Sequence, residues 1–459
     1  MDGGVPAVNS RRMSRSRAGD RRMNGAAPAL WALAVMSLVA TGLGAAGAGM
    51  ATDDEPNHEV WVIDQSDTRA DGGGTLYVYP GDQLAGRDAG AATPEVIDLG
   101  GAARTLCLDA THSAPRRPHM LAFDSRHTRA VVSFVTTGHV LFLDAATRAP
   151  VGCIDVGVQA HAAQPTPDDR SVIVANQNGK LLQRITTDYA TNTFVLDSAA
   201  TLDLAHCVTP SGALCEEPTL RRDNAPICPI IDASGRFAFV TLRGGGMFVV
   251  ETSSTPMRIV AEYDRSVVHP NGCGGVESSG KMYVNSGGGT PINPSESDLY
   301  AFPINGFSSA PNAPNTPAPH IVFSHDDREP ADSHGVVLTK GGRYVWAADR
   351  AANIMVVVDT TTDAVVNEIQ LAGAVSPDPT PDLLALSPAG NRVYAALRGP
   401  VPLTGNAPNN NAKGSTPGVG VLRVQAGGAA GELQGVARIT HVVGGVEAAD
   451  PHGIGVRRR

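Results

Sequence analysis

A β-rich unit recurs along this 459-residue chain at intervals of 42 to 48 residues wherever no insertion intervenes. His119 and His161 lie 42 residues apart, and His334 and Asp382 lie 48 residues apart. Each of these anchor residues is followed nine or ten positions later by an arginine: Arg129, Arg170, Arg343 and Arg392. A period of this length, built from short β-branched runs broken by Gly and Pro, is typical of the four-stranded blades of a propeller.

The two ends of the chain complete this pattern. The first unit shows only three strand-like runs, His58–Asp64, Gly74–Tyr79 and Pro94–Leu99, while one run, Asp450–Val456, is left over at the C-terminus. Pairing the last run with the first would leave no incomplete blade. The sequence therefore predicts an all-β fold, a seven-bladed β-propeller of four-stranded blades closed by a C-terminal strand that completes the first blade.

The N-terminus has the pattern of an export signal. Six arginines precede an apolar run, roughly Ala29 to Leu43, which ends in small residues. The run is short for a membrane-spanning helix, which is the alternative interpretation. We expect a signal peptide and upstream basic segment over residues 1–51, a linker over 52–57 and a single propeller domain over 58–459. The mature protein is then exported, periplasmic or extracellular, and has no membrane attachment.

Charge narrows the range of partners. Removing residues 1–51 takes away six arginines and two aspartates, so the formal net charge moves from −9 to −13. A chain this acidic is not expected to bind nucleic acid or an anionic membrane surface.

The six cysteines are an even number, which permits disulfides in an exported protein. Cys207 and Cys215 are close enough in one insertion to staple a loop. Cys228 and Cys273 fall on neighbouring innermost strands, where a cross-blade disulfide and a thiolate metal site are the alternatives. Cys107 and Cys153 are the remaining candidates for a pair. No CxxCH motif is present, which excludes covalent c-type haem.

Histidines recur at one position of the repeat. ADSHG and ADPHG stand at residues 331–335 and 449–453, and looser copies place further residues at the same register. Because innermost strands run side by side around the channel of a propeller, residues at one register form a ring. The predicted ring is His119, His161, Ile227, Gly272, His334, Asp382 and His452.

Imidazoles that converge with a carboxylate suit copper, zinc, iron or nickel. We therefore predict a metal site, with copper or another transition metal as the cofactor, made by His119, His161, His334, His452 and Asp382. The gaps at Ile227 and Gly272 would leave room for a substrate or water. The alternative is structural: the start of an inner strand is wet, and a histidine there can bond backbone carbonyls or water.

Two aspartates, Asp332 and Asp450, lie two residues before their histidines and could orient an imidazole or cap a turn between blades. We expect the side chains of His334 and His452 to face the channel and to contribute little packing.

Several units resemble the YVTN-type β-propeller family. Tyr344-Val345 and Met282-Tyr283-Val284-Asn285 occupy the place of its Tyr-Val-x-Asn motif, and Val358-Asp359-Thr360 follows as its next strand. This family includes lactonase-like propellers and relatives of the nitrous oxide reductase propeller, whose copper ligands lie on inner strands. The resemblance to that copper site extends only to His119, His334 and His452, and we recognise no cupredoxin domain among the residues of this sequence.

No nucleophile motif, phosphate loop or HExxH is present, so the sequence identifies no reaction. The leading prediction is an exported binding or interaction scaffold with a protein or small-molecule partner at the propeller face. The alternatives are a periplasmic metal- or quinone-dependent oxidoreductase and a lactonase-like hydrolase.

Overall fold

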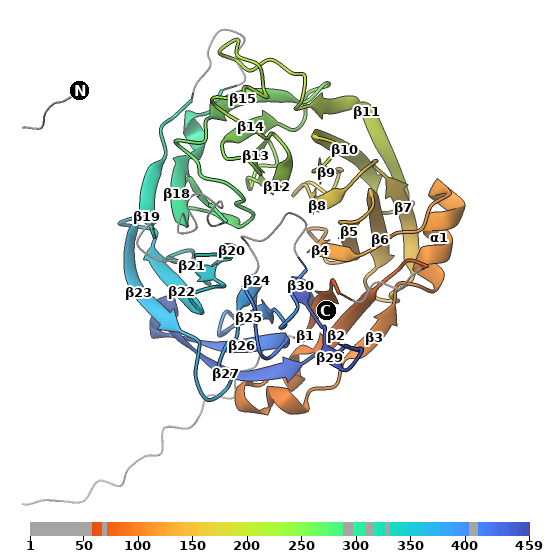
Figure 1. The fold of residues 1–459 in the computed structure, drawn as a ribbon, viewed down its shortest axis with the longest axis vertical. Coiled ribbons are helices and arrows are strands. Elements are labelled where there is room, and N and C mark those ends of the chain that lie inside the picture. The colour runs from red at the N-terminus through yellow and green to blue at the C-terminus, as the bar shows by residue number, and fades with distance from the viewer. Residues whose placement is uncertain (1–56, 67–70, 288–296, 309–315, 326–330, 404–411) are drawn as a thin grey trace, which may run out of the picture. The chain divides into compact units, whose positions relative to one another are not determined.

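Seven four-stranded antiparallel sheets surround a central axis in the computed structural model (Figure 1). The structure describes residues 57–66, 71–287, 297–308, 316–325, 331–403 and 412–459. The predicted signal peptide, residues 1–51, lies outside these ranges. The predicted all-β, seven-bladed architecture is confirmed.

Each blade runs outward from an innermost strand beside the axis, and the chain adds the strands in order. The second and third blades are β4 (Pro118–Phe123), β5 (Arg129–Phe134), β6 (His139–Asp144) and β7 (Pro150–Asp155), then β8 (Ala160–Pro165), β9 (Ser171–Asn176), β10 (Leu181–Asp188) and β11 (Thr193–Asp203). The fourth and fifth are β12 (Pro226–Ile231), β13 (Phe237–Leu242), β14 (Met247–Glu251) and β15 (Arg258–Tyr263), then β16 (Gly275–Ser278), β17 (Lys281–Asn285), β18 (Asp298–Pro303) and β19 (His320–Ser324). The sixth and seventh are β20 (Ser333–Leu338), β21 (Tyr344–Asp349), β22 (Ile354–Asp359) and β23 (Ala364–Gln370), then β24 (Pro381–Leu386), β25 (Arg392–Leu397), β26 (Gly418–Gln425) and β27 (Ala430–Arg438).

The first blade is made from both ends of the chain. Its strands are β1 (His58–Asp64), β2 (Thr75–Pro80), β3 (Glu95–Asp98) and the C-terminal β30 (Pro451–Arg458). β30 pairs antiparallel with β1, with Val60 opposite Val456 and Val62 opposite Ile454, so it takes the innermost place. This is the predicted ring closure, and it removes a sheet edge that would otherwise be unpaired.

The hydrophobic core lies between neighbouring blades. Trp61 of the first blade packs with its ring edge toward Phe123 of the second, at a centroid distance of 5.2 Å, in a cluster that also contains Phe134. Trp346 is fully buried and donates its indole N–H to the carbonyl of Gly428 at 2.7 Å. Each sheet therefore buries both faces. This explains why the middle strands read as continuous apolar runs, without polar residues in alternation.

The described residues contain one α-helix, α1 (Ala102–Thr111), which lies outside the strand pattern and was not predicted. It lies at the outer edge of the second blade, and its buried Cys107 forms a disulfide with Cys153 of β7 (Figure 1). The predicted Cys207–Cys215 disulfide is confirmed, and Cys228 and Cys273 are also joined.

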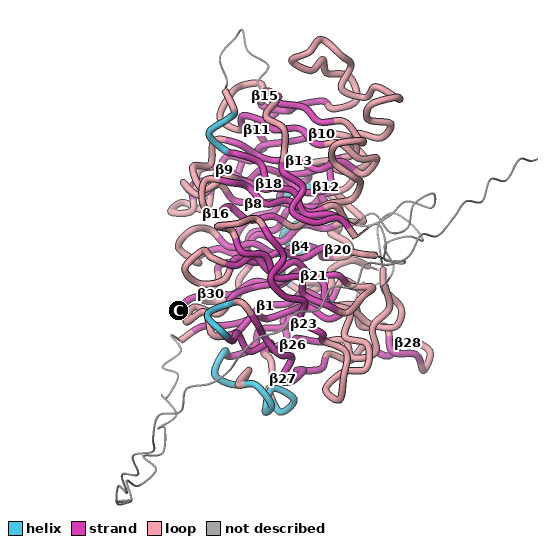
Figure 2. Tube along the Cα trace, turned by 90° about the vertical axis from the view of Figure 1, so that its left-hand side faces the viewer, coloured by secondary structure: helices cyan, strands magenta, loops and turns pink. Residues whose placement is uncertain are grey.

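A short hairpin of β28 (Val442–Val443) and β29 (Val446–Glu447) precedes β30. It projects from one face of the disc (Figure 2). No helix among the described residues has the length and apolar character needed to cross a membrane.

Candidate metal centre

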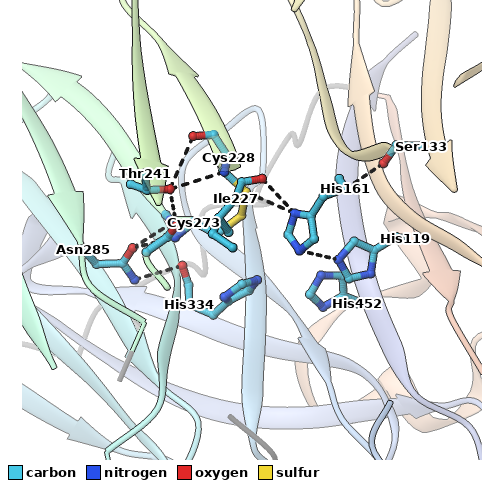
Figure 3. The surroundings of a disulfide bond; sticks show 12 residues. His119, Ser133, His161, Ile227, Cys228, Thr241, Cys273, Asn285, His334 and His452 are labelled. Carbon is cyan, nitrogen blue, oxygen red and sulfur yellow. Dashed lines mark hydrogen bonds between the residues drawn. A yellow bond between two sulfur atoms is a disulfide. The ribbon is translucent and has the colours of Figure 1, made fainter. Parts of the chain in front are cut away.

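The four histidines predicted for the ring meet at the axis of the propeller (Figure 3). The Nε2 atoms of His119 and His161, on adjacent inner strands β4 and β8, lie 3.3 Å apart. The ring of His452 on β30 stacks on His119 with centroids 4.0 Å apart, and the ring of His334 lies 5.2 Å from that of His452. The repeat alignment therefore placed these side chains at one level.

The cluster is buried, whereas the sequence suggested a wet position. All four histidines are at most 7% exposed, and Asp382 is completely buried. The described ends of the long insertion after β25 contact two carboxylates beside the cluster. The backbone N–H of Leu403 donates to Asp450 at 2.6 Å, and that of Ala412 donates to Asp332 at 3.3 Å. Both contacts lie on the side of the cluster where the inner strands begin.

Glycines explain how the inner strands come close enough for the rings to touch. A Cβ on Gly335 would stand 2.2 Å from the carbonyl oxygen of Asp382, and one on Gly453 would stand 2.5 Å from that of His119. Only glycine allows such an approach of backbone to backbone. In both ADSHG and ADPHG, the histidine therefore places its side chain in the channel. The glycine after it leaves room for the backbone of the next blade.

Gly274 makes the same contact with the carbonyl oxygen of His334. By this equivalence Cys273, and not Gly272, occupies the ring position in the fifth blade. The predicted alignment was wrong here by one residue, because the Gly-rich turn before β16 gives no strand pattern to align.

The ring position in the fourth blade is filled and does not leave the expected space. The side chain of Ile227 is buried with Met120, Ala162, Cys228 and Cys273. Its backbone carbonyl accepts a hydrogen bond from His161 Nδ1 at 2.8 Å.

Three of the histidines have Nδ1 held by an acceptor. His161 Nδ1 bonds the Ile227 carbonyl, His119 Nδ1 bonds Gln65 Oε1 at 3.0 Å, and His452 Nδ1 bonds Asp382 Oδ2 at 2.7 Å. Within the described part of the chain, the buried Nε2 atoms of His334 and His452 have no hydrogen-bond partner. These contacts aim ring nitrogens, and not ring carbons, at the interior of the cluster.

A chain of alternating charges runs beside the histidines. Arg350 donates to Asp332 at 2.5 Å and to Asp382 at 3.0 Å. Arg398 lies 3.5 Å from Asp382 and donates to Asp450 at 2.9 Å and 2.8 Å. Asp332 and Asp450 therefore pair with arginines, and this is a third role beside the two that were predicted for them.

The row of hydrogen-bonded groups continues from Asp450 to Gln65 and Arg117. Gln65 Nε2 donates to Asp450 at 2.9 Å, and Arg117 donates to Gln65 Oε1 at 3.1 Å. Sequence reasoning missed Gln65, Arg117, Arg350 and Arg398. A signal was present for three of them, since Gln65, Arg350 and Arg398 directly follow the second strands of their blades, β1, β21 and β25.

Burial and neighbouring charges lower the pKa of three histidines of the cluster, His119, His161 and His334, and so favour their neutral forms. Burial, together with His452, lowers the pKa of His161 to about 3, and burial with the same neighbour holds the pKa of His119 well below its usual range. Burial opposes the ionisation of Asp382, but His452, Arg350 and His334 outweigh it and hold the carboxyl pKa well below normal. The centre thus offers neutral imidazole nitrogens beside a permanent carboxylate.

His452 contributes more to packing than expected. It is 2% exposed, stacks on His119 and bonds Asp382. The expectation that this side chain contributes little packing was wrong, because the glycine contacts draw the inner strands close together around it.

No protein-family model and no curated protein matches the chain. Solved structures of similar fold do exist. The periplasmic gluconolactonase of Pseudomonas aeruginosa has a TM-score of 0.53 at 13% identity and covers 87% of this chain and 99% of its own. A putative 6-phosphogluconolactonase from Bacteroides uniformis has a TM-score of 0.53 at 11% identity, covering 88% and 100%. A protein from Lactobacillus plantarum has a TM-score of 0.51 at 11% identity, covering 87% and 99%. At these identities the likeness shows the propeller fold alone.

Proposed function

We propose that this protein is an exported propeller that binds a transition-metal ion at the histidine cluster of its channel and serves as a metal-dependent binding scaffold. One observation carries the proposal. The Nε2 atoms of His119 and His161 face each other at 3.3 Å, and we infer from their other partners that neither carries a proton.

The missing proton follows from the partners of the two Nδ1 atoms. The Ile227 carbonyl can only accept, so His161 carries its proton on Nδ1. The amide of Gln65 is oriented from both sides, because its Nε2 donates to Asp450 and its Oε1 accepts from Arg117. His119 Nδ1 must therefore donate to Gln65 Oε1. A neutral imidazole protonated on Nδ1 has a bare lone pair on Nε2.

Two buried lone pairs in contact repel each other unless a cation lies between them. A metal ion fits the spacing, since two nitrogens bound at about 2.0–2.1 Å in tetrahedral geometry stand about 3.3–3.4 Å apart. His334 and His452 carry further buried Nε2 atoms without a hydrogen-bond partner, and ligand atoms of these two residues and Asp382 lie within 4.8 Å of one another. Neutral imidazole ligands favour copper, zinc, iron or nickel.

Asp382 has a supporting role in this proposal. Its Oδ2 accepts from His452 Nδ1 and its Oδ1 from Arg350, so both oxygens are already engaged. A carboxylate that holds the distal N–H of a metal-binding histidine fixes the ring and raises its basicity. We assign Asp382 as the positioning residue for His452, and its direct ligation of the metal, predicted from sequence, is the alternative.

The exported setting is supported by the three disulfides, which form and persist in oxidising compartments.

Metal analysis of the purified protein tests the proposal. We expect one transition-metal ion per chain after the protein is stripped with a chelator and reloaded, with binding followed by calorimetry. His119→Ala combined with His161→Ala should abolish the binding. His320→Ala, at an exposed position on β19, is the matched control and should bind like the wild type.

A folded wild-type protein that takes up neither zinc nor copper would overturn the proposal. The identity of the metal also separates the alternatives from the sequence. Bound copper or iron that cycles between oxidation states would favour the oxidoreductase, whereas zinc would be consistent with a scaffold or a hydrolase.

A further inference from the structure

The Cys228–Cys273 disulfide differs from the other two disulfides in the residues that surround it. It joins β12 to the segment just before β16, across the gap between two blades, beside the histidine cluster (Figure 3). The Sγ of Cys228 lies 3.9 Å from His161 Nδ1. Among the residues that the structure describes, this is the only disulfide whose two sulfurs and a histidine nitrogen all lie within 4.8 Å of one another.

A pocket of about 230 Å³ borders this disulfide, whose cysteines are 2% and 6% exposed. Its wall includes Gln164 and Pro165 at the end of β8, Ile230 and Ile231 at the end of β12, and both cysteines. These strand ends lie beyond the histidine register, on the side away from the contacts of Leu403 and Ala412. The pocket beside the disulfide therefore lies on a different side of the cluster from the contacts of Leu403 and Ala412.

We propose that the Cys228–Cys273 disulfide is redox-active, and that its reduced form, together with His161, is a second metal site that takes zinc or Cu(I). Two thiolates and an imidazole are a ligand set that these ions prefer. The disulfide and the thiolate site, which are alternatives at the level of sequence, are then two oxidation states of one site.

The reaction requires a reductant, and a dithiol of small size or on a partner protein would supply it. One thiolate of the dithiol attacks a sulfur of the disulfide and forms a mixed disulfide, releasing the other cysteine. The second thiol of the reductant then releases the first cysteine. The reductant loses two electrons and two protons and becomes a disulfide, while Cys228 and Cys273 become thiols. A metal ion that binds both sulfurs displaces their two protons.

His161 connects this site with the proposed histidine site, because its two nitrogens face different sides. Nε2 faces His119 and Nδ1 faces Ile227 and Cys228. To ligate through Nδ1, the imidazole must move its proton from Nδ1 to another acceptor, and the Ile227 carbonyl loses that bond. The thiolate site needs no metal at the histidine cluster, so the two proposals can fail separately.

Cobalt(II) is the probe that tests the inference, because thiolate ligation gives a charge-transfer absorption that imidazole ligation lacks. The full-length protein is compared in its oxidised form and after reduction by a phosphine that is then removed without air. We expect the thiolate band only in the reduced protein. Cys228→Ser with Cys273→Ser should lose it, although this variant keeps the other four cysteines.

Three further variants assign the signal. Cys207→Ser with Cys215→Ser is the matched control and should keep the band. His334→Ala with His452→Ala should also keep the band while losing the cobalt that the oxidised protein binds, which distinguishes this site from the histidine cluster. His161→Ala should weaken cobalt binding to the reduced protein at least tenfold.

Alkylation of the wild type gives a second measurement that does not depend on whether the serine variant folds. In reduced protein, zinc should protect Cys228 and Cys273 from iodoacetamide while Cys207 and Cys215 stay reactive, as read by peptide mass spectrometry. The inference is wrong if the reduced wild type shows no thiolate band, if the band survives in the Cys228→Ser, Cys273→Ser variant, or if zinc protects neither cysteine.

Discussion

The guanidinium of Arg457 donates a 3.0 Å hydrogen bond to the carboxylate of Glu59, although the two residues lie 398 positions apart in the sequence. Glu59 is completely buried and also accepts from Arg148, Arg459 and the indole of Trp61 at 3.0 Å. The first and last strands of the propeller are therefore joined by charge as well as by backbone pairing.

Removing the last strand should open the ring. A protein that ends before Ala449 lacks β30, so β1 keeps an unpaired edge and Glu59 loses Arg457 and Arg459. We expect insoluble protein or a large fall in melting temperature, measured by scanning calorimetry. Equal melting temperatures for the truncated and complete chains would contradict the closure described here.

Acid should weaken the same junction. Burial opposes the ionisation of Glu59, but its hydrogen bonds to Arg459, Trp61, Arg457 and Arg148 lower its pKa from 4.5 to about 2. Because the folded-state pKa is the lower one, the stabilisation is complete above about 4.5 and is lost as pH falls from there towards 2.

Allowing for the partial exposure of Arg459, this contribution is about 1–3 kcal/mol of unfolding free energy. Glu59→Gln should lose it at neutral pH and show a flatter pH dependence in urea unfolding. Glu95→Gln, which removes a more exposed partner of Arg148, is the control and should change little. Parallel pH profiles for Glu59→Gln and the wild type would exclude this role.

Asp382→Asn should affect both stability and metal affinity. It preserves the shape of the side chain but removes the charge that Arg350 and Arg398 share, at a cost of about 3–5 kcal/mol. Weaker orientation of His452 should lower metal affinity about 10–100-fold. Asp363→Asn breaks an ion pair with Lys281 away from the channel and should leave metal affinity unchanged. Normal affinity in a folded Asp382→Asn protein would argue against the positioning role.

Gly453→Ala should strain the junction between β30 and β4. Its Cβ would stand 2.5 Å from the carbonyl oxygen of His119, so the strands must separate. We expect a loss of about 1–3 kcal/mol in unfolding free energy, as for overpacking elsewhere. Gly444→Ala probes the effect of a positive φ without such a contact, because no atom lies within 4 Å of its Cβ. The clash argument requires Gly453→Ala to be the more destabilising of the two.

The propeller could be predicted from the sequence because a repeated strand pattern indicates blades even when the contacts between them are unknown. Strand runs recurred with one anchor residue per unit, and the surplus run near Asp450 matched the deficit before His58. The same register brought His119, His161, His334 and His452 together. The metal ligation that we infer from their meeting is still a prediction.

The partners of the histidines could not be predicted in this way. The acceptor for His161 is the backbone of Ile227, and a backbone carbonyl has no signature in a sequence. Gln65 and Arg398 follow the ends of second strands, and whether such a side chain turns toward the axis depends on the contacts between blades. Helix α1 was missed because ten residues with two buried side chains give a weak helical pattern.

The place of His452 in the chain has a consequence for the order of events during synthesis. Translation adds this residue after every other histidine of the cluster, and it lies on the strand that closes the ring. A nascent chain can form the middle blades early, yet it cannot assemble the cluster until β30 has been made. Closure and assembly of the cluster are then one late event, and a chain released too soon would lack both.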